Sequence, residues 1–117
     1  MNNFKVKSSF VVVLLYTSLF ISCKKESTTA SCSSTISYAS DISTLMSQSC
    51  TGCHNSSNAA GGYNLTTYSN VKSNANIILK SMRHTGGVNP MPEGSSKLSS
   101  SVVDQFDCWI QQGKKNN

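Results

Sequence analysis

The chain has 117 residues, a length that suits one small domain. Its formal net charge is +5, and without Lys5 and Lys7 near the start eight basic residues remain against five acidic ones. This surplus of three positive charges is small, and no basic stripe is interleaved with aromatic residues, so the sequence argues against binding of nucleic acid. No acid–base pair for catalysis is apparent either, because the acidic residues beyond the first thirty positions are scattered: Asp41, Glu93, Asp104 and Asp107.

The start of the chain has the pattern of an export signal. Lys5 and Lys7 precede an apolar run over 10–21 that is short for a bilayer span and has the length of a signal-peptide core. Residues 19–23 (LFISC) resemble the lipobox of a bacterial lipoprotein, with Phe20 where leucine is more usual. We therefore expect a signal peptide over 1–22 and a lipidated Cys23, with an ordinary secretory signal as the alternative. Either signal carries the protein out of the cytoplasm, to the periplasm or the cell surface.

Residues 23–34 contain mainly Lys, Glu, Ser and Thr and have almost nothing to bury. We expect them to form a flexible tether between the lipid and a domain over 35–113, which a polar tail over 114–117 follows. Lys24 and Lys25 come directly after the lipidated cysteine, where they could meet anionic headgroups of the membrane.

A helix is predicted over 41–49. Ser40 and Asp41 can cap its N-terminus, and Ile42, Leu45 and Met46 recur on one helical face. This helix runs directly into residues 50–54 (CTGCH), a C-x-x-C-H motif.

The C-x-x-C-H motif is typical of covalent attachment of a c-type haem. Cys50 and Cys53 fall on the same side of one helical turn, so they could form thioethers to the two vinyl groups of one porphyrin. His54 follows at once and could be the proximal axial ligand of the iron, and Gly52 leaves room for a flat macrocycle near the backbone. A chance occurrence of the motif is one alternative, and a redox dithiol and half of a zinc site are the others. Neither a βαβ pattern nor a second Cys/His pair accompanies the motif to support them.

The segment after the motif predicts loops and short helices. Residues 55–64 are rich in Gly, Asn and Ser and indicate a loop. Thr66 or Thr67 can then cap a short helix that carries Tyr68 and Val71. A separate helix is expected over 75–82, and prolines exclude regular structure in the long loop over 83–98.

The closing helix is the clearest periodic element. One of three serines (99–101) can cap it, and Val103, Phe106 and Ile110 lie on one face, with Val102 and Trp109 beside them. Gly113 suits the position just after its end. Because no alternating strand pattern of useful length occurs, the predicted fold class is all-α, with about three to four helices and long loops.

Met91 is the first candidate for the distal ligand of the iron. Pro90 and Pro92 flank it and stiffen the loop, so little entropy is lost when the thioether binds. Ligation by Met and His leaves no open coordination position, which suits electron transfer. Met82 and His84 are the other candidates, and an open sixth position is the remaining alternative. Met82 suits a core position on a helical face, and His84 suits an exposed loop or a hydrogen bond to a haem propionate.

The two other cysteines, Cys32 and Cys108, are left over once Cys23 is assigned to lipid and the motif to haem. In an oxidising compartment they are expected to form a disulfide, worth about 3–4 kcal/mol for so long a loop. Two unpaired thiols are the alternative.

Several stretches of the sequence, taken together, resemble a known family. They are the C-x-x-C-H motif after a short helix, residues 61–65 (GGYNL) followed by Tyr68, Met91-Pro92, residues 97–99 (KLS) and residues 108–113 (CWIQQG). The chain resembles, over 37–113, a small monohaem cytochrome c, most closely the class I-like haem domains of exported proteins of Bacteroidetes and Planctomycetes. Glu93 departs from the family, in which many members have a second proline there.

The resemblance implies one covalent haem c, with thioethers at Cys50 and Cys53, His54 as proximal ligand and Met91 as distal ligand. It also implies that the first and last helices cross behind the haem, with Ile42, Leu45 and Met46 near Phe106, Trp109 and Ile110. The expected function is electron transfer between redox partner proteins by an exported, membrane-anchored carrier that is not an enzyme. A haem enzyme or sensor with an open sixth position, peroxidase-like or gas-binding, is the alternative.

Overall fold

The structure, a computed structural model, describes residues 29–117, so the export signal, Cys23 and the first part of the expected tether lie outside it. The elements are two short turns of helix, η1 (Tyr38–Ile42) and η2 (Ala60–Gly62), and three α-helices, α1 (Ser43–Ser49), α2 (Tyr68–Arg83) and α3 (Ser100–Gln111). No strand occurs within the described range, where the only ladder contact is an isolated bridge between His54 and Ala59. The prediction of a mostly helical protein is confirmed.

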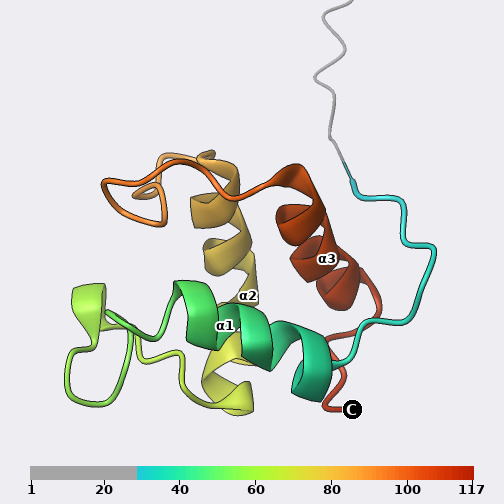
Figure 1. Cartoon of the computed structure of the whole chain (residues 1–117), viewed down its shortest axis with the longest axis horizontal. Coiled ribbons are helices and arrows are strands. Elements are labelled where there is room, and N and C mark those ends of the chain that lie inside the picture. The colour runs from blue at the N-terminus through green and yellow to red at the C-terminus, as the bar shows by residue number, and fades with distance from the viewer. Residues whose placement is uncertain (1–28) are drawn as a thin grey trace, which may run out of the picture.

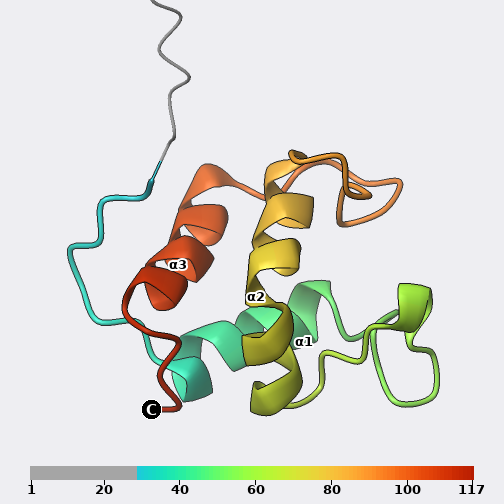
Figure 2. The same cartoon turned by 180° about the vertical axis from the view of Figure 1, so that it is seen from behind.

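Helices α2 and α3 lie side by side and run in opposite directions, and η1 with α1 crosses their lower ends (Figure 1). Figure 2 shows the same arrangement from behind, with α2 in front of α1. Twelve buried side chains from these elements and Leu65, which lies between η2 and α2, form one core: Tyr38, Ile42, Leu45, Met46, Leu65, Val71, Ala75, Ile78, Leu79, Met82, Val103, Phe106 and Trp109. Ile110 is half-buried and packs against that core. The first and last helices meet through η1, where the ring of Tyr38 lies 5.7 Å from that of Trp109.

The first helix begins earlier than the sequence pattern predicts, at Tyr38 instead of Asp41. The N-cap is Ser37, whose side chain accepts a hydrogen bond from the N–H of Ser40 at 3.3 Å. The carboxylate of Asp41 in turn accepts from the N–H of Ser37 at 2.8 Å. Ser40 and Asp41 thus lie inside the first turn, and the reciprocal pair satisfies N–H groups that a helix start leaves without partners.

The two helices predicted around Tyr68 and over 75–82 are one continuous helix, α2. Thr67 caps it by accepting from the N–H of Asn70, as one of the two predicted caps. Its buried residues form an unbroken helical stripe that the weak helix formers Ser73 and Asn74 do not interrupt: Val71, Ala75, Ile78, Leu79 and Met82. The side chain of Asn74 donates to the carbonyl of Asn70 one turn earlier, so it lies along the helix. Burial of the stripe outweighs low local propensity.

The closing helix, α3, matches its predicted range. Ser99 is the N-cap and Gly113 follows the end with φ +91°, a conformation that glycine adopts without strain. Trp109 and Phe106 are fully buried, whereas Ile110 is only half-buried. The centre of the buried face is therefore shifted toward Trp109, which the sequence pattern places at its flank.

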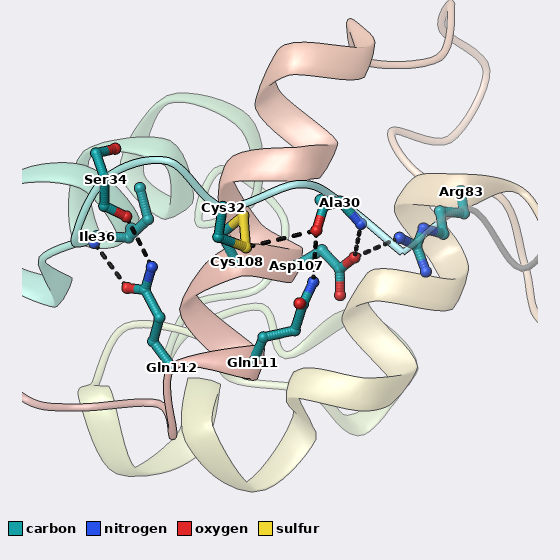
Figure 3. The surroundings of a disulfide bond; sticks show 9 residues. All are labelled: Ala30, Cys32, Ser34, Ile36, Arg83, Asp107, Cys108, Gln111 and Gln112. Carbon is teal, nitrogen blue, oxygen red and sulfur yellow. Dashed lines mark hydrogen bonds and ion pairs between the residues drawn. A yellow bond between two sulfur atoms is a disulfide. The ribbon is translucent and has the colours of Figure 1, made fainter.

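A disulfide joins Cys32 to Cys108 in α3, with Cα atoms 5.5 Å apart, and the two cysteines are 76 positions apart in sequence. Figure 3 shows that the residues around Cys32 lie along α3. The amide group of Gln112 holds this segment at two points, because its nitrogen donates to the carbonyl of Ser34 (2.7 Å) and its oxygen accepts from the N–H of Ile36 (2.8 Å). Residues 30–36, which we call the strap, are thus bound along α3.

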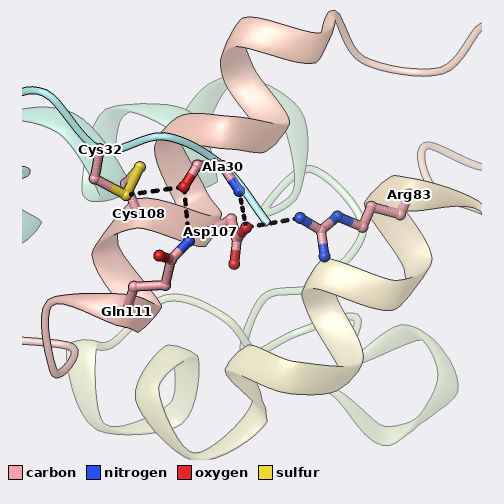
Figure 4. A network of polar contacts seen from close by, with 6 residues as sticks. All are labelled: Ala30, Cys32, Arg83, Asp107, Cys108 and Gln111. Carbon is pink, nitrogen blue, oxygen red and sulfur yellow. Dashed lines mark hydrogen bonds and ion pairs between the residues drawn. A yellow bond between two sulfur atoms is a disulfide. The ribbon is translucent and has the colours of Figure 1, made fainter. Parts of the chain in front are cut away.

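The strap is bound at its other end by Asp107, which is 6% exposed (Figure 4). One carboxylate oxygen accepts from the N–H of Ala30 at 3.0 Å and lies 2.7 Å from a guanidinium nitrogen of Arg83 at the end of α2. A buried carboxylate needs such partners, since the loss of solvation is costly without them. Asp107 thus links the strap, α2 and α3. Among the described residues, contacts between the expected tether and the domain are present from Ala30 onward, ahead of the expected domain start at residue 35.

The polar tail returns to the start of the domain. The main-chain oxygen of Asn117 accepts from the N–H of Ala39 (2.9 Å), and its side-chain oxygen accepts from the N–H of Tyr38 (3.1 Å). The carbonyls of Lys114 and Lys115 accept from the hydroxyl of Tyr68 and the indole N–H of Trp109, each at 2.9 Å. The tail therefore satisfies polar groups of three elements.

Candidate cofactor-attachment site

The C-x-x-C-H motif forms a turn at the end of α1. The N–H groups of Cys50 and Thr51 both donate to the carbonyl of Met46, which is buried in the core. The N–H groups of Cys53 and His54 both donate to the carbonyl of Cys50, at 3.2 and 3.0 Å. The motif is therefore held by hydrogen bonds of its own and is attached to the core through the helix before it.

The two cysteines of the motif are free thiols in different surroundings. Cys53 is exposed, whereas Cys50 is half-buried against the core. Burial raises the pKa of the Cys50 thiol to about 11, because the thiolate loses solvation there. Both sulfurs are thus available for bond formation, and Cys53 is the more accessible of the two.

His54 presents its two ring nitrogens differently. Nδ1 lies 3.2 Å from the carbonyl oxygen of Tyr63, and since a carbonyl only accepts, Nδ1 carries the proton of this bond. In the neutral ring Nε2 then has the free electron pair. Histidines that bind metal commonly hold their other N–H in such a bond, which sets the tautomer and the ring direction. The arrangement suits ligation of a metal through Nε2.

The loop over 55–64 is ordered by Asn55, whose role the sequence analysis did not identify. Its side-chain nitrogen donates to the carbonyls of Thr51 and Gly52, and its oxygen accepts from the N–H groups of Ser57 and Asn58. The side chain thus links the motif to the loop that brings Tyr63 to His54. An Asn followed by small polar residues is a known signal for such a turn, so this part was recoverable from the sequence.

Gly52 is not required by the packing of the protein. A Cβ built there would meet no atom within 4 Å, and the residue is exposed. The space beside it is open, as attachment of a flat group at this turn would need.

The three candidates for a distal ligand have separate roles in the structure. Met82 is 2% exposed within the core, where it fills space. His84 is exposed, and its Nε2 lies 3.2 Å from the carbonyl oxygen of Met91. Met91 is half-buried and precedes Pro92 through a cis peptide bond. Of the two methionines, only Met91 thus lies outside the core.

The loop over 84–98 and the segment over 50–62 lie on the same side of the molecule, away from the C-terminus (Figures 1 and 2). No hydrogen bond within the described residues joins the two segments. The structure therefore brings Cys50, Cys53 and His54 into one turn and leaves Met91 in a separate loop on that side. A groove of about 360 Å³ beside Cys32 and Cys108 and a cavity of about 190 Å³ lined by Tyr38, Met46 and Thr51 contain none of these four residues.

Among residues 29–117 no three His, Cys, Asp or Glu side chains are grouped so as to hold a metal ion. No helix in that range is long and apolar enough to cross a membrane. Comparison with known proteins found no match to this chain among protein-family models, curated proteins or solved structures.

Proposed function

We propose that the protein is an exported electron carrier with one covalently bound haem c. The observation that carries the proposal is the pairing of His54 with Tyr63 directly after two free cysteines in one turn. A dithiol or a coincidental C-x-x-C-H run would not need a histidine whose Nδ1 is bound to a carbonyl and whose Nε2 is left as an acceptor. The resemblance to a small monohaem cytochrome c supports the same assignment.

The residues of the site would divide the work as follows. Cys50 and Cys53 would hold the haem through thioethers, and His54 would ligate its iron through Nε2. Met91 would be the second axial ligand, since Met82 is committed to the core. A bound haem supplies one-electron exchange between the ferrous and ferric states. Two protein ligands would leave no coordination position for a substrate, which favours a carrier over an enzyme or sensor.

Haem staining of the denatured protein tests the attachment, because covalent haem survives denaturation and a bound zinc ion does not. The full chain, expressed where c-type haem is attached, is expected to stain, and Cys50→Ala/Cys53→Ala is expected to lose the stain. Cys32→Ala/Cys108→Ala is the matched control, since it also removes two cysteines but leaves the motif, and it should keep the stain. An unstained wild-type band would refute the proposal.

The ferric absorption spectrum tests the ligand set. Ligation by methionine gives a weak far-red band, which Met91→Leu should abolish and Met82→Leu, the control in the core, should retain. A high-spin ferric spectrum of the wild type that shifts at once with cyanide would instead support the haem enzyme or sensor.

Anchoring by lipid is also a proposal, which the lipobox-like residues 19–23 support. Cys23 would carry the lipid and the following residues would keep the haem domain near the membrane. Labelling with a radioactive fatty acid should be lost in Cys23→Ser, and retained label would contradict this assignment.

A further inference from the structure

Met91 is held to the end of α2 through both polar groups of its main chain. Its N–H donates to the carbonyl oxygen of Ser81 at 3.1 Å, and its own carbonyl oxygen accepts from Nε2 of His84 at 3.2 Å. Ser81 lies in the last turn of α2 and His84 is the C-cap of that helix. The helix end thus sets the position of Met91, and neither bond uses the thioether.

His84 has a backbone conformation that favours glycine. Its φ of 55° and ψ of 46° are left-handed, and its N–H bonds back to the carbonyls of Lys80 and Ser81. Helices commonly end on such a residue, usually a glycine, because a Cβ is strained there. A histidine at this cap supplies what glycine lacks, a side chain that can donate to Met91. The strain is therefore offset by a contact across the base of the loop.

The loop that this contact closes has few other restraints. Gly86 and Gly87 both have positive φ, and the residues over 84–87 are exposed. His84 and Met91 are seven positions apart, so their hydrogen bond closes the segment into a ring. Without this hydrogen bond, only the other of the two bonds described above, from the N–H of Met91 to the carbonyl of Ser81, would hold Met91 to the end of α2. Loops of this kind open easily when few bonds hold them.

We propose that His84 is a positioning residue that keeps Met91 in place as the distal ligand. The inference rests on the proposed function, in which Met91 ligates the iron. Loss of the His84 side chain should let Met91 leave its place more often. The sixth position would then be open to outside ligands for a larger part of the time.

Three variants separate the side chain of His84 from its backbone role. His84→Gly keeps the left-handed conformation without strain and removes the donor. His84→Asn also tolerates that conformation, but its amide nitrogen lies nearer the backbone, at the place of Nδ1. His84→Gln carries an amide nitrogen at about the place of Nε2 and is the conservative rescue. Removal of one hydrogen bond changes an equilibrium by a factor of roughly 3–10.

Two measurements on the full-length protein test the proposal. Hydrogen exchange of the Met91 amide, which donates to the carbonyl of Ser81, should become faster by roughly 3–10-fold in His84→Gly and His84→Asn, with recovery in His84→Gln. The affinity of the ferric protein for added imidazole should rise by a similar factor in the same two variants. Unchanged exchange and unchanged imidazole affinity in His84→Gly, with wild-type circular dichroism, would overturn the proposal.

Met91→Leu distinguishes a failure of this inference from a failure of the proposed function. If Met91→Leu binds imidazole no more tightly than the wild type, Met91 is not the distal ligand, and both the ligand assignment and this inference fall. If Met91→Leu binds it more tightly and His84→Gly does not, only the role of His84 is refuted.

Discussion

Cys50 and Cys53 share one turn but differ in exposure to solvent. The thiolate is the reactive form of cysteine, and burial raises the pKa of Cys50 from 9.0 to about 11. The raised pKa means that the fold favours the protonated thiol. The protonated thiol of Cys50 therefore makes its full contribution to the free energy of unfolding below pH 9. This contribution is lost as the pH rises through about 11. Burial, together with the charge of Tyr68, also raises the pKa of Tyr38. Ionisation of Tyr38 at high pH therefore lowers the free energy of unfolding as well.

We expect iodoacetamide to modify Cys53 before Cys50 in the haem-free protein. Burial raises the pKa of Cys50 to about 11, so only about a thousandth of this thiol is ionised at pH 8. The half-buried position of Cys50 slows its reaction further, whereas Cys53 is exposed. Mass spectrometry of the modified peptides measures both rates. Cys50→Ala and Cys53→Ala, each with one thiol of the motif left, assign them. Equal rates of modification below pH 9 would contradict the burial of Cys50 in the haem-free chain. In urea, which unfolds the chain, equal rates are expected and serve as the control.

At the scale of elements, the first helix depends on residues from the other end of the chain. Asn117 accepts hydrogen bonds from two N–H groups at the start of η1, where a helix has no acceptors of its own. Lys114 and Lys115 receive bonds from the side chains of Tyr68 and Trp109 through main-chain oxygens only. The polar tail is thus part of the fold by its backbone.

Removal of residues 114–117 should lower the free energy of unfolding by roughly 1–3 kcal/mol, because N–H groups of η1 and two aromatic side chains lose acceptors. Urea denaturation of the haem-loaded protein measures the change. Lys114→Ala/Lys115→Ala is the matched control, expected within about 0.5 kcal/mol of the wild type since its carbonyls remain. A truncated protein as stable as the wild type would show that water replaces these acceptors without loss.

At the scale of the whole molecule, the disulfide and the hydrogen bonds of the strap act together. Four positions at the end of α3 hold the strap, namely Asp107, Cys108, Gln111 and the C-cap Gln112. The disulfide also limits the unfolded chain, and this effect grows with the length of the closed loop. The strap should therefore matter more to stability than its few buried atoms suggest.

Cys32→Ala/Cys108→Ala should lower the free energy of unfolding by about 3–4 kcal/mol in the haem-loaded protein. A reducing agent such as dithiothreitol should cause a similar loss in the wild type and none in the double variant, which controls for effects on other groups. Denaturation curves measured with and without reductant give both values. A loss below about 1 kcal/mol would mean that the hydrogen bonds of Asp107 and Gln112 hold the strap without the disulfide.

Features that depend on neighbouring residues could be predicted from the sequence alone. The C-x-x-C-H turn, the range of α3 and the glycine after it follow from patterns within one or two helical turns. The count of cysteines also left Cys32 and Cys108 as the pair that the structure joins. Such features are local or few in number, so little competes with them.

Features that join groups distant in the sequence became known only from the packing of the whole chain. The continuity of α2 follows from a stripe buried against other elements, which outweighed the weak helix formers Ser73 and Asn74. Which nitrogen of His54 is left as an acceptor depends on the carbonyl of Tyr63, and the start of η1 depends on Asn117, 79 positions from Tyr38. Main-chain carbonyls are present at every residue and leave no mark in the sequence. Their partners become known only when the packing of the chain brings them together.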